Sequence, residues 1–289
     1  MKKGSLLLVI LLSFSWIVYL QIIDKDTPSR QIELSTTERI PVTYNETQLN
    51  HSFNQVSAHK QISSVRGLII PHHLVASDMI AEALLSIDSS TVDRIILIGP
   101  NHGEFGDHTA ISSNVDWELK DGLVQCDIEL YEELLGEGYI AEDVVVLQNE
   151  HAIMVPIPYL HYVFPQAKIL PVTLSENQSI ERLSALGERI APSEDTLIIA
   201  SIDFSHYLTE SESYVNDEIT ISAIESMDIE SLYEFDSDYL DSSSSIIVLL
   251  EAMKAAGSTE IEILGHSNSA TIQGLDLGST TSYYTVVLK

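Results

Sequence analysis

Cysteine and basic residues are scarce in this chain. A single cysteine, Cys126, among 289 residues excludes an internal disulfide and any zinc or iron–sulfur site built from several thiolates. The 14 lysines and arginines face 43 aspartates and glutamates, which gives a formal net charge of -29. Because phosphate backbones are bound by clustered Lys and Arg, no nucleic-acid partner is expected. Glycine-rich nucleotide-binding motifs and the Gly-x-Ser-x-Gly nucleophile elbow are also missing.

A long uncharged run is confined to the N-terminus. Lys2 and Lys3 precede the stretch 4–23, which at about 20 residues can span a bilayer as a helix. No small-x-small cleavage site and no cysteine follow it, so we expect residues 1–23 to be an uncleaved signal anchor rather than a lipoprotein leader. The positive-inside rule then places the rest of the chain outside the cytoplasm, single-pass in the cell membrane. If the leader is cleaved instead, the protein is secreted.

The remainder divides into a linker and one domain. Residues 24–64 are polar and aperiodic, which predicts a tether, and part of this tether could pack on the domain. Residues 65–289 alternate strand-like apolar runs with helix-length segments, which predicts a single α/β domain with a mixed or mostly parallel central sheet flanked by helices. Strands are predicted at 67–70, 94–98, 168–172, 196–201, 260–264 and 282–288, and helices at 77–86, 127–136, 179–190, 211–227 and 242–256. An antiparallel insertion is predicted over 109–113, 117–120 and 122–126.

Three histidine motifs each stand where a strand-like run ends. They are Pro71-His72-His73, Gly99-Pro100-Asn101-His102 and Asp203-Phe204-Ser205-His206. In open α/β sheets ligands bind in the crevice at the carboxyl ends of the strands, so these histidines can converge there. Two histidines and one carboxylate on one face form a non-haem metal site with open positions. We expect His72, His102 and Asp241 to be the ligands, although Asp241 could instead be the N-cap of the helix predicted after it.

The other strand-end polar residues suit proton transfer. His151 and His206 could act as general acid or base beside the metal, because imidazole titrates near neutrality. Asp203 could hold His206 in one tautomer. Each histidine taken singly is more often a hydrogen-bonded structural residue. Since adjacent residues of an extended segment point in opposite directions, only one of His72 and His73 is expected to face the metal, and we choose His72.

The ordered motifs resemble those of the Memo family, also called AmmeMemoRadiSam system protein B. The motifs are Gly67 to His72, Ile96 to His102, Glu150 to Ile153 with Pro158 to Leu160, Ser201 to Tyr207, and Ile246 to Ala252. The resemblance spans roughly Gly67 to Lys289 and implies an α/β domain similar to class III extradiol ring-cleaving dioxygenases, with a non-haem iron at the edge of the sheet. It implies His72 and His102 as ligands, and it places Asp241 where the family has cysteine. A carboxylate there favours iron(II), with manganese or zinc as alternatives, over copper(I).

These observations lead to one leading hypothesis and two rivals. We expect a Memo-like extracytoplasmic domain with one divalent metal, and, if it is an enzyme, a dioxygenase-like oxygenase or a hydrolase. The rival is a non-catalytic module that binds a metal, a peptide or a small ligand. A third reading, a scaffold without a working site, requires Asp241 to point away from both histidines. The acidic chain favours a neutral or cationic ligand, and membrane contact is expected through the N-terminal helix only.

Overall fold

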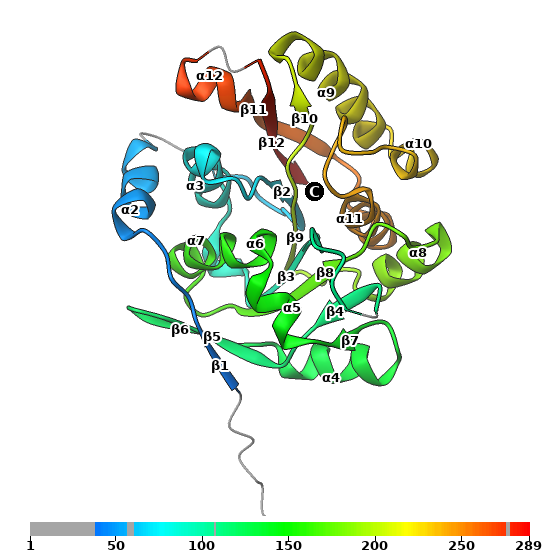
Figure 1. The fold of residues 1–289 in the computed structure, drawn as a ribbon. Helices are drawn as coiled ribbons and strands as arrows, with labels where there is room; N and C mark the ends of the chain where they lie inside the picture. Colours follow the sequence, from blue (N-terminus) through cyan, green and yellow to red (C-terminus); the bar gives the residue numbers. More distant parts are fainter. Residues whose placement is uncertain (1–37, 57–60, 107, 276–277) are drawn as a thin grey trace, which may run out of the picture. The chain divides into compact units, whose positions relative to one another are not determined.

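A mixed sheet forms the centre of the protein (Figure 1). The computed structural model describes residues 38–56, 61–106, 108–275 and 278–289. The strands of the nine-stranded sheet are β2 Gly67–Ile70, β3 Arg94–Pro100, β4 Ala110–Ser112, β7 Ala141–Glu142, β8 Lys168–Leu174, β9 Thr196–Ser201, β10 His206–Leu208, β11 Ile261–Asn268 and β12 Thr280–Leu288. Their order is β10-β12-β2-β9-β3-β8-β4-β7, with β11 paired to β12. The central strands β2, β9, β3 and β8 are parallel, and antiparallel pairs flank them on both sides.

Helices cover both faces of this sheet. The helices in the described ranges are α2 Glu46–Gln55, α3 Ser77–Leu85, α4 Ile128–Gly136, α5 Val144–Asn149, α6 His151–Met154, α7 Pro156–Val163, α8 Ile180–Arg189, α9 Glu210–Glu225, α10 Ile229–Tyr233, α11 Ser243–Ala256 and α12 Ser269–Gln273, with short 3-10 turns at Leu74–Ala76 and Ser89–Thr91. A smaller sheet joins β1 Glu38–Pro41, β5 Val115–Leu119 and β6 Gly122–Val124. The predicted α/β class, mixed sheet and flanking helices are therefore confirmed.

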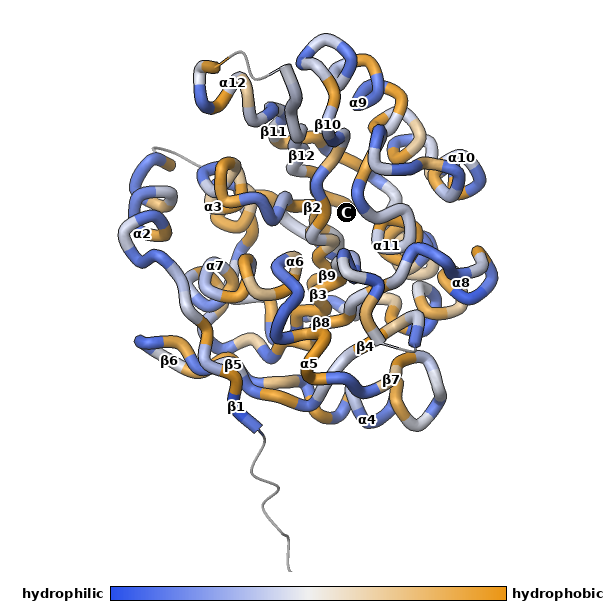
Figure 2. Tube along the Cα trace, viewed as in Figure 1, coloured by the Kyte–Doolittle hydropathy of each residue, from blue (hydrophilic) through white to orange (hydrophobic). Residues whose placement is uncertain are grey.

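Alternate residues of the central strands feed two separate apolar cores. In β3, Ile96 and Ile98 pack into the core that contains residues of α4, α8 and α11. Ile95 and Leu97 pack into the core that contains residues of α3 and α7. Successive side chains of a strand point to opposite faces, so a strand covered on both sides is apolar throughout. Figure 2 shows these apolar runs in orange in the middle of the fold.

Most predicted element boundaries agree with the structure, and the insertion does not. Strands β2 and β9 have the predicted bounds, and α11 begins one residue late because Ser242 is its N-cap. Of the predicted antiparallel insertion, only β5 and β6 pair with each other. Strand β4 instead joins the central sheet, antiparallel to β8.

Part of the predicted tether, residues 38–56, packs on the domain. This segment contains β1, which pairs in parallel with β5, and helix α2. Ile40 and Phe53 are buried in the core beneath α3 and α7. Asn45, the first residue of a possible glycosylation sequon, caps α2 by accepting hydrogen bonds from the N–H groups of Thr47 and Gln48. The sequence does not predict helix α2, because only two of its buried residues, Leu49 and Phe53, are apolar.

The predicted signal anchor, residues 1–23, lies outside the described residues. No helix in the described ranges combines the length and the apolar character that a bilayer crossing requires. The fold therefore bears on the domain alone, and the membrane anchor stays a prediction.

Replacing Phe53 with alanine tests whether α2 belongs to the fold. The Phe53 ring stacks on Tyr162 with 3.9 Å between centroids and lies 5.8 Å from that of Tyr159. We expect Phe53→Ala to lower the free energy of unfolding by about 3–5 kcal/mol, the range for a buried phenylalanine. The exposed neighbour Asn54 supplies the control, and Asn54→Ala should change stability by less than about 0.5 kcal/mol. Equal denaturant midpoints for the two variants would show that α2 does not stabilise the domain and is only a tether.

Candidate functional site

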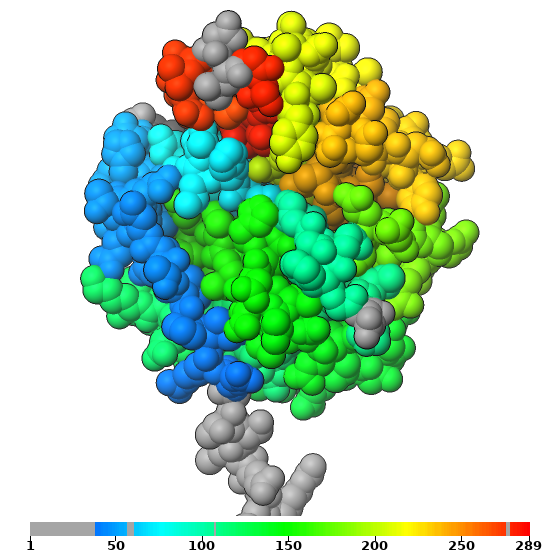
Figure 3. All heavy atoms as spheres, in the orientation of Figure 1, coloured from blue at the N-terminus to red at the C-terminus, as the bar shows by residue number. Residues whose placement is uncertain are grey.

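The candidate site lies at the carboxyl ends of the parallel strands. His72 follows β2, His102 follows β3 and Asp203 follows β9, and these strands are neighbours in the sheet. Parallel strands place their carboxyl ends at one edge, which is where ligands bind in open α/β sheets. In Figure 3 the cyan, teal, green and yellow segments that carry the site meet near the middle of the face shown.

His72 is buried and fixed at both of its ends. Its backbone N–H donates to Oδ1 of Asp203 over 3.1 Å, and its Nδ1 lies 3.2 Å from the carbonyl oxygen of Ser201. A carbonyl can only accept, so Nδ1 carries a proton and Nε2 is the nitrogen left for other contacts. Nε2 lies 3.2 Å from Oδ2 of Asp241.

Glu150 fixes His102 with both carboxylate oxygens. The backbone N–H of His102 donates to Oε2 over 2.9 Å, and Nδ1 lies 2.8 Å from Oε1. Glu150 is buried and also caps α6, because Oε1 accepts from the N–H of Ala152. Nε2 of His102 then lies 3.6 Å from Oδ2 of Asp241. A carboxylate on the far nitrogen of a histidine is the arrangement that orients metal ligands.

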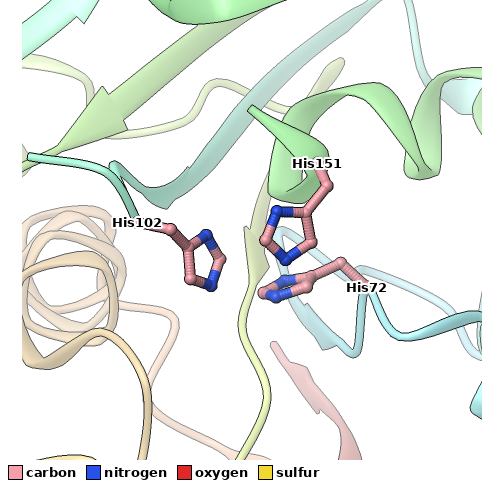
Figure 4. Close-up of side chains that lie close together, drawn as sticks. All are labelled: His72, His102 and His151. Atoms are coloured by element: carbon pink, nitrogen blue, oxygen red, sulfur yellow. The ribbon is translucent and has the colours of Figure 1, made fainter. Parts of the chain in front are cut away.

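His151 is the first residue of α6 and completes a group of three imidazoles (Figure 4). Its ring stacks on that of His102 at 4.1 Å between centroids and meets that of His72 edge-on at 4.9 Å. A glycine in β3 permits this approach: a Cβ on Gly99 would lie 2.9 Å from the Cβ of Ala152. The backbones of β3 and α6 therefore lie close together, and the sheet itself sets the position of His151.

Asp241 is positioned by a reciprocal pair of hydrogen bonds with Asp203. The N–H of Asp203 donates to Oδ2 of Asp241 over 3.1 Å, and the N–H of Asp241 donates to the carbonyl of Asp203 over 3.0 Å. Ser242, not Asp241, caps α11 by accepting from the N–H of Ser245. The N-cap alternative for Asp241 is therefore wrong. Oδ1 of Asp241 is buried and has no hydrogen-bond partner in the described ranges.

The predicted pairing of Asp203 with His206 is not found. Asp203 contacts His72 instead, through the backbone N–H and with 3.8 Å between Oδ2 and Nε2. Nδ1 of His206 is buried and has no partner among the described residues. Nδ1 of His73, the neighbour of the chosen His72, lies 2.6 Å from the hydroxyl of Tyr283.

A cavity of about 450 Å³ opens beside the cluster. Five of its lining residues are histidines, namely His72, His73, His102, His151 and His206. Its volume falls within the range of small-molecule sites, about 300–1,000 Å³. The predicted residues His72, His102, His151, His206 and Asp203 therefore share one cavity wall, and Asp241 lies directly behind His72 and His102.

The charged groups of the cluster shift one another's pKa values, and burial raises the pKa of Asp203. Burial alone would lower the pKa of His72, but Asp203 and Asp241 raise it to about 9. Burial also opposes protonation of His102, and hydrogen bonds to Asp241 and Glu150 raise its pKa to about 10. Burial would raise the pKa of Asp241, yet His72 and His102 hold it well below its ordinary value. His151 is different, because burial and the neighbouring imidazoles lower its pKa to about 4.

Two sets of side chains offer donor atoms close enough for one ion. They are His72, His102 and His151, and His72, Asp203 and Asp241, with the donor atoms of each set within 4.8 Å of one another. The predicted triad of His72, His102 and Asp241 draws on both sets. Asp241 faces both histidines, so the condition set for a scaffold without a site is not met. The roles of these residues stay predictions.

Comparison with known proteins decides the family. A family model described as Memo-like protein matches residues 43–287. The chain belongs to this family. The Memo-like match begins before residue 65, in agreement with the packed segment 38–56.

Several curated relatives of this Memo-like chain carry the name MEMO1 family protein. One from Nitrosopumilus maritimus is 29% identical over 245 residues, which cover 81% of this chain and 88% of the relative. One from Aquifex aeolicus is 30% identical over 231 residues, which cover 77% and 83%. One from Methanosarcina barkeri is 30% identical over 237 residues, which cover 78% and 87%.

A solved structure supports the fold of the Memo-like domain. The crystal structure of the uncharacterized protein JW3007 from Escherichia coli K12 superposes with a TM-score of 0.53 over 77% of this chain and 99% of that protein. The two sequences are 11% identical, so the likeness concerns the fold only.

Two residues that shape the Memo-like site were not predicted from the sequence. Glu150 directly precedes His151, and no role was predicted for it. An acidic residue before a helix can signal the N-cap of that helix. Gly99 belongs to the second histidine motif, but its role is seen only in the structure, where a Cβ at this position would meet Ala152. The helices α5, α6 and α7, which carry or support His151, were not predicted as helices.

Proton release should accompany metal binding. Since the raised pKa values of His72 and His102 keep both imidazoles protonated at pH 7, an ion on their Nε2 atoms must displace about two protons. The apparent affinity for Zn²⁺ should therefore rise between about pH 6 and pH 9. Calorimetry of Zn²⁺ uptake in buffers of different ionisation enthalpy counts the protons. Uptake with no proton release would contradict the raised pKa values of His72 and His102.

Proposed function

We propose that this Memo-like chain is an enzyme that works with one divalent metal ion held by His72, His102 and Asp241. The position of Asp241 carries the proposal, because one carboxylate oxygen lies 3.2 Å and 3.6 Å from the Nε2 atoms of the two histidines. Its other oxygen is buried with no partner in the described part of the chain. Buried polar atoms are nearly always paired, and an ion would satisfy this one.

The donor set indicates which ions fit. Two imidazole nitrogens and one carboxylate oxygen suit iron(II), and they also suit manganese(II) and zinc(II). Copper(I) prefers thiolate or thioether sulfur, and Cys126 is buried in the core away from this cluster. When bound, iron(II) would supply dioxygen chemistry, whereas zinc or manganese would supply Lewis acidity for hydrolysis. We favour iron(II), because two histidines and one carboxylate form the ligand set typical of non-haem iron(II) oxygenases.

The residues around the ion have separate tasks in this proposal. Nδ1 of His72 and of His102 stay bonded to Ser201 and Glu150, so both rings hold their orientation. His151 is half exposed to the cavity and has a lowered pKa, so it is neutral and able to take a proton from a ligand. His206 and Asp203 lie on the same wall and can pass or hold a proton there. The cavity admits a small molecule or the end of a peptide.

We also propose that residues 4–23 anchor the protein in the cell membrane, with the domain outside the cytoplasm. The uncharged run after Lys2 and Lys3 is the support for this proposal. A protease added to intact cells should then degrade the domain, and protection of the domain would contradict the orientation.

Metal content of single variants separates the two possible ligand sets. The wild-type full-length chain, reconstituted with iron(II) without oxygen, should hold close to one ion per chain by elemental mass spectrometry. Asp241→Ala and His102→Ala should each lose it, and His151→Ala should retain it. His51→Ala removes a histidine at an exposed position of α2, so it controls for the loss of a histidine outside the cluster.

The opposite pattern has a clear meaning. Loss of the ion in His151→Ala with full content in Asp241→Ala would replace the proposed triad by the three histidines. If wild type and both variants bind the ion equally, the ion does not bind at this cluster. Stoichiometric binding with every coordination position occupied by protein atoms would favour the binding-module rival over the enzyme.

Glu150 should control metal affinity without touching the ion. Loss of the carboxylate frees both Nδ1 and the backbone N–H of His102. We expect Glu150→Ala to weaken Zn²⁺ affinity by about 10–100-fold, measured by competition with a chromophoric chelator. Glu150→Gln keeps an acceptor oxygen and should lose less. An affinity equal to wild type in Glu150→Ala would show that His102 needs no such support.

A further inference from the structure

Tyr207 is the most exposed large apolar side chain in the described ranges, with 78% of its surface accessible. It directly follows His206, and it lines the histidine cavity. An exposed aromatic ring at the wall of a cavity has an environment typical of ligand-binding residues rather than of the core.

The backbone of Tyr207 is in a conformation that tyrosine rarely adopts. Its φ is 61°, in the left-handed region, where a bulky side chain is an outlier. His206 pairs with Thr281 and Leu208 pairs with Thr280, so Tyr207 is an extra residue between them. This register shift is a β-bulge in β10, a device that re-aims side chains next to active sites.

The side chain of Tyr207 makes few contacts that the described part of the chain can account for. Among the aromatic rings of the described residues, that of Tyr207 pairs with the ring of His206, at 5.6 Å between centroids and 53° between planes. Its hydroxyl has no hydrogen-bond partner among the described residues. Strained residues persist mainly where function uses them, so the compensation for this strain is expected from a ligand.

We infer that Tyr207 is a specificity-determining residue, whose ring forms a platform for a ring or other flat apolar group of the ligand. The inference rests on the proposed function, because the polar head of the same ligand would reach the metal ion. Leu74 and Val155 line the same cavity and add apolar surface to its histidine wall. A ligand with a metal-binding head and a flat apolar group therefore matches both kinds of lining.

Two hydroxamates isolate the ring. Acetohydroxamate and benzohydroxamate share the metal-binding head and differ in a phenyl ring. With the Zn²⁺-loaded full-length chain in detergent, calorimetry should show tighter binding of benzohydroxamate to wild type and to Tyr207→Phe. In Tyr207→Asn this preference should fall about tenfold, which is the affinity that one pair of aromatic rings contributes. The affinity for acetohydroxamate should be unchanged.

Thermal stability separates a ligand platform from a structural residue. Asparagine tolerates the left-handed region, so Tyr207→Asn should raise Tm by about 2–4 °C. A structural role predicts a lower Tm. Tyr162→Asn is the control for loss of an exposed aromatic ring, because Tyr162 is 51% exposed and packs on Phe53. It should leave the hydroxamate preference unchanged.

The possible failures are distinct. An unchanged preference for benzohydroxamate in Tyr207→Asn overturns the platform and leaves the metal centre intact. A lower Tm for that variant also overturns it, because the ring would then support the fold. Absence of acetohydroxamate binding to the Zn²⁺-loaded wild type overturns the proposed metal centre and the platform with it.

Discussion

The burial of two carboxylates beside an imidazole is the constraint on which this structure depends. Asp203 and Asp241 lie at the edge of the sheet with almost no access to water, and an unpaired buried charge is costly. Each carboxylate accepts a backbone N–H, from His72 and from Asp203 respectively, and both face His72. These contacts join the end of β2, the end of β9 and the start of α11, so the same bonds close the fold and shape the site.

This arrangement also explains how an ion fits a cluster that is already charged. In the metal-free protein the protons on His72 and His102 place two positive charges beside the buried carboxylates, and burial raises the pKa of Asp203. A divalent cation carries the same charge as the two protons that it displaces, so the carboxylates keep their counter-charge. Glu150 adds a third carboxylate to the cluster, where it lies 2.8 Å from Nδ1 of His102.

Sequence reasoning reached the parts of the fold and site that local patterns encode. Strands such as β2 and β9 are recognisable because burial on both faces makes them apolar throughout, and His72 and His102 stand at strand ends. The contact of Asp203 with His72 joins residues 131 positions apart, so sequence proximity wrongly suggested His206 as the partner. The strand and helix of the segment 38–56 were not predicted, because only a few of its side chains are apolar. The bulge at Tyr207 has no local signal, since no glycine or asparagine marks it.

The glycine in β3 makes the histidine cluster sensitive to a position that never touches the cavity. Because Gly99 lets the backbones of β3 and α6 lie close, a single methyl group there would push against Ala152 and displace the helix start. His151 would then lose its stacking on His102. Substitutions at Gly99, inside the sheet, should therefore affect the histidine cluster as strongly as substitutions in the cavity wall. Related proteins can then differ in reactivity because their packing differs, although the residues that line the cavity are the same.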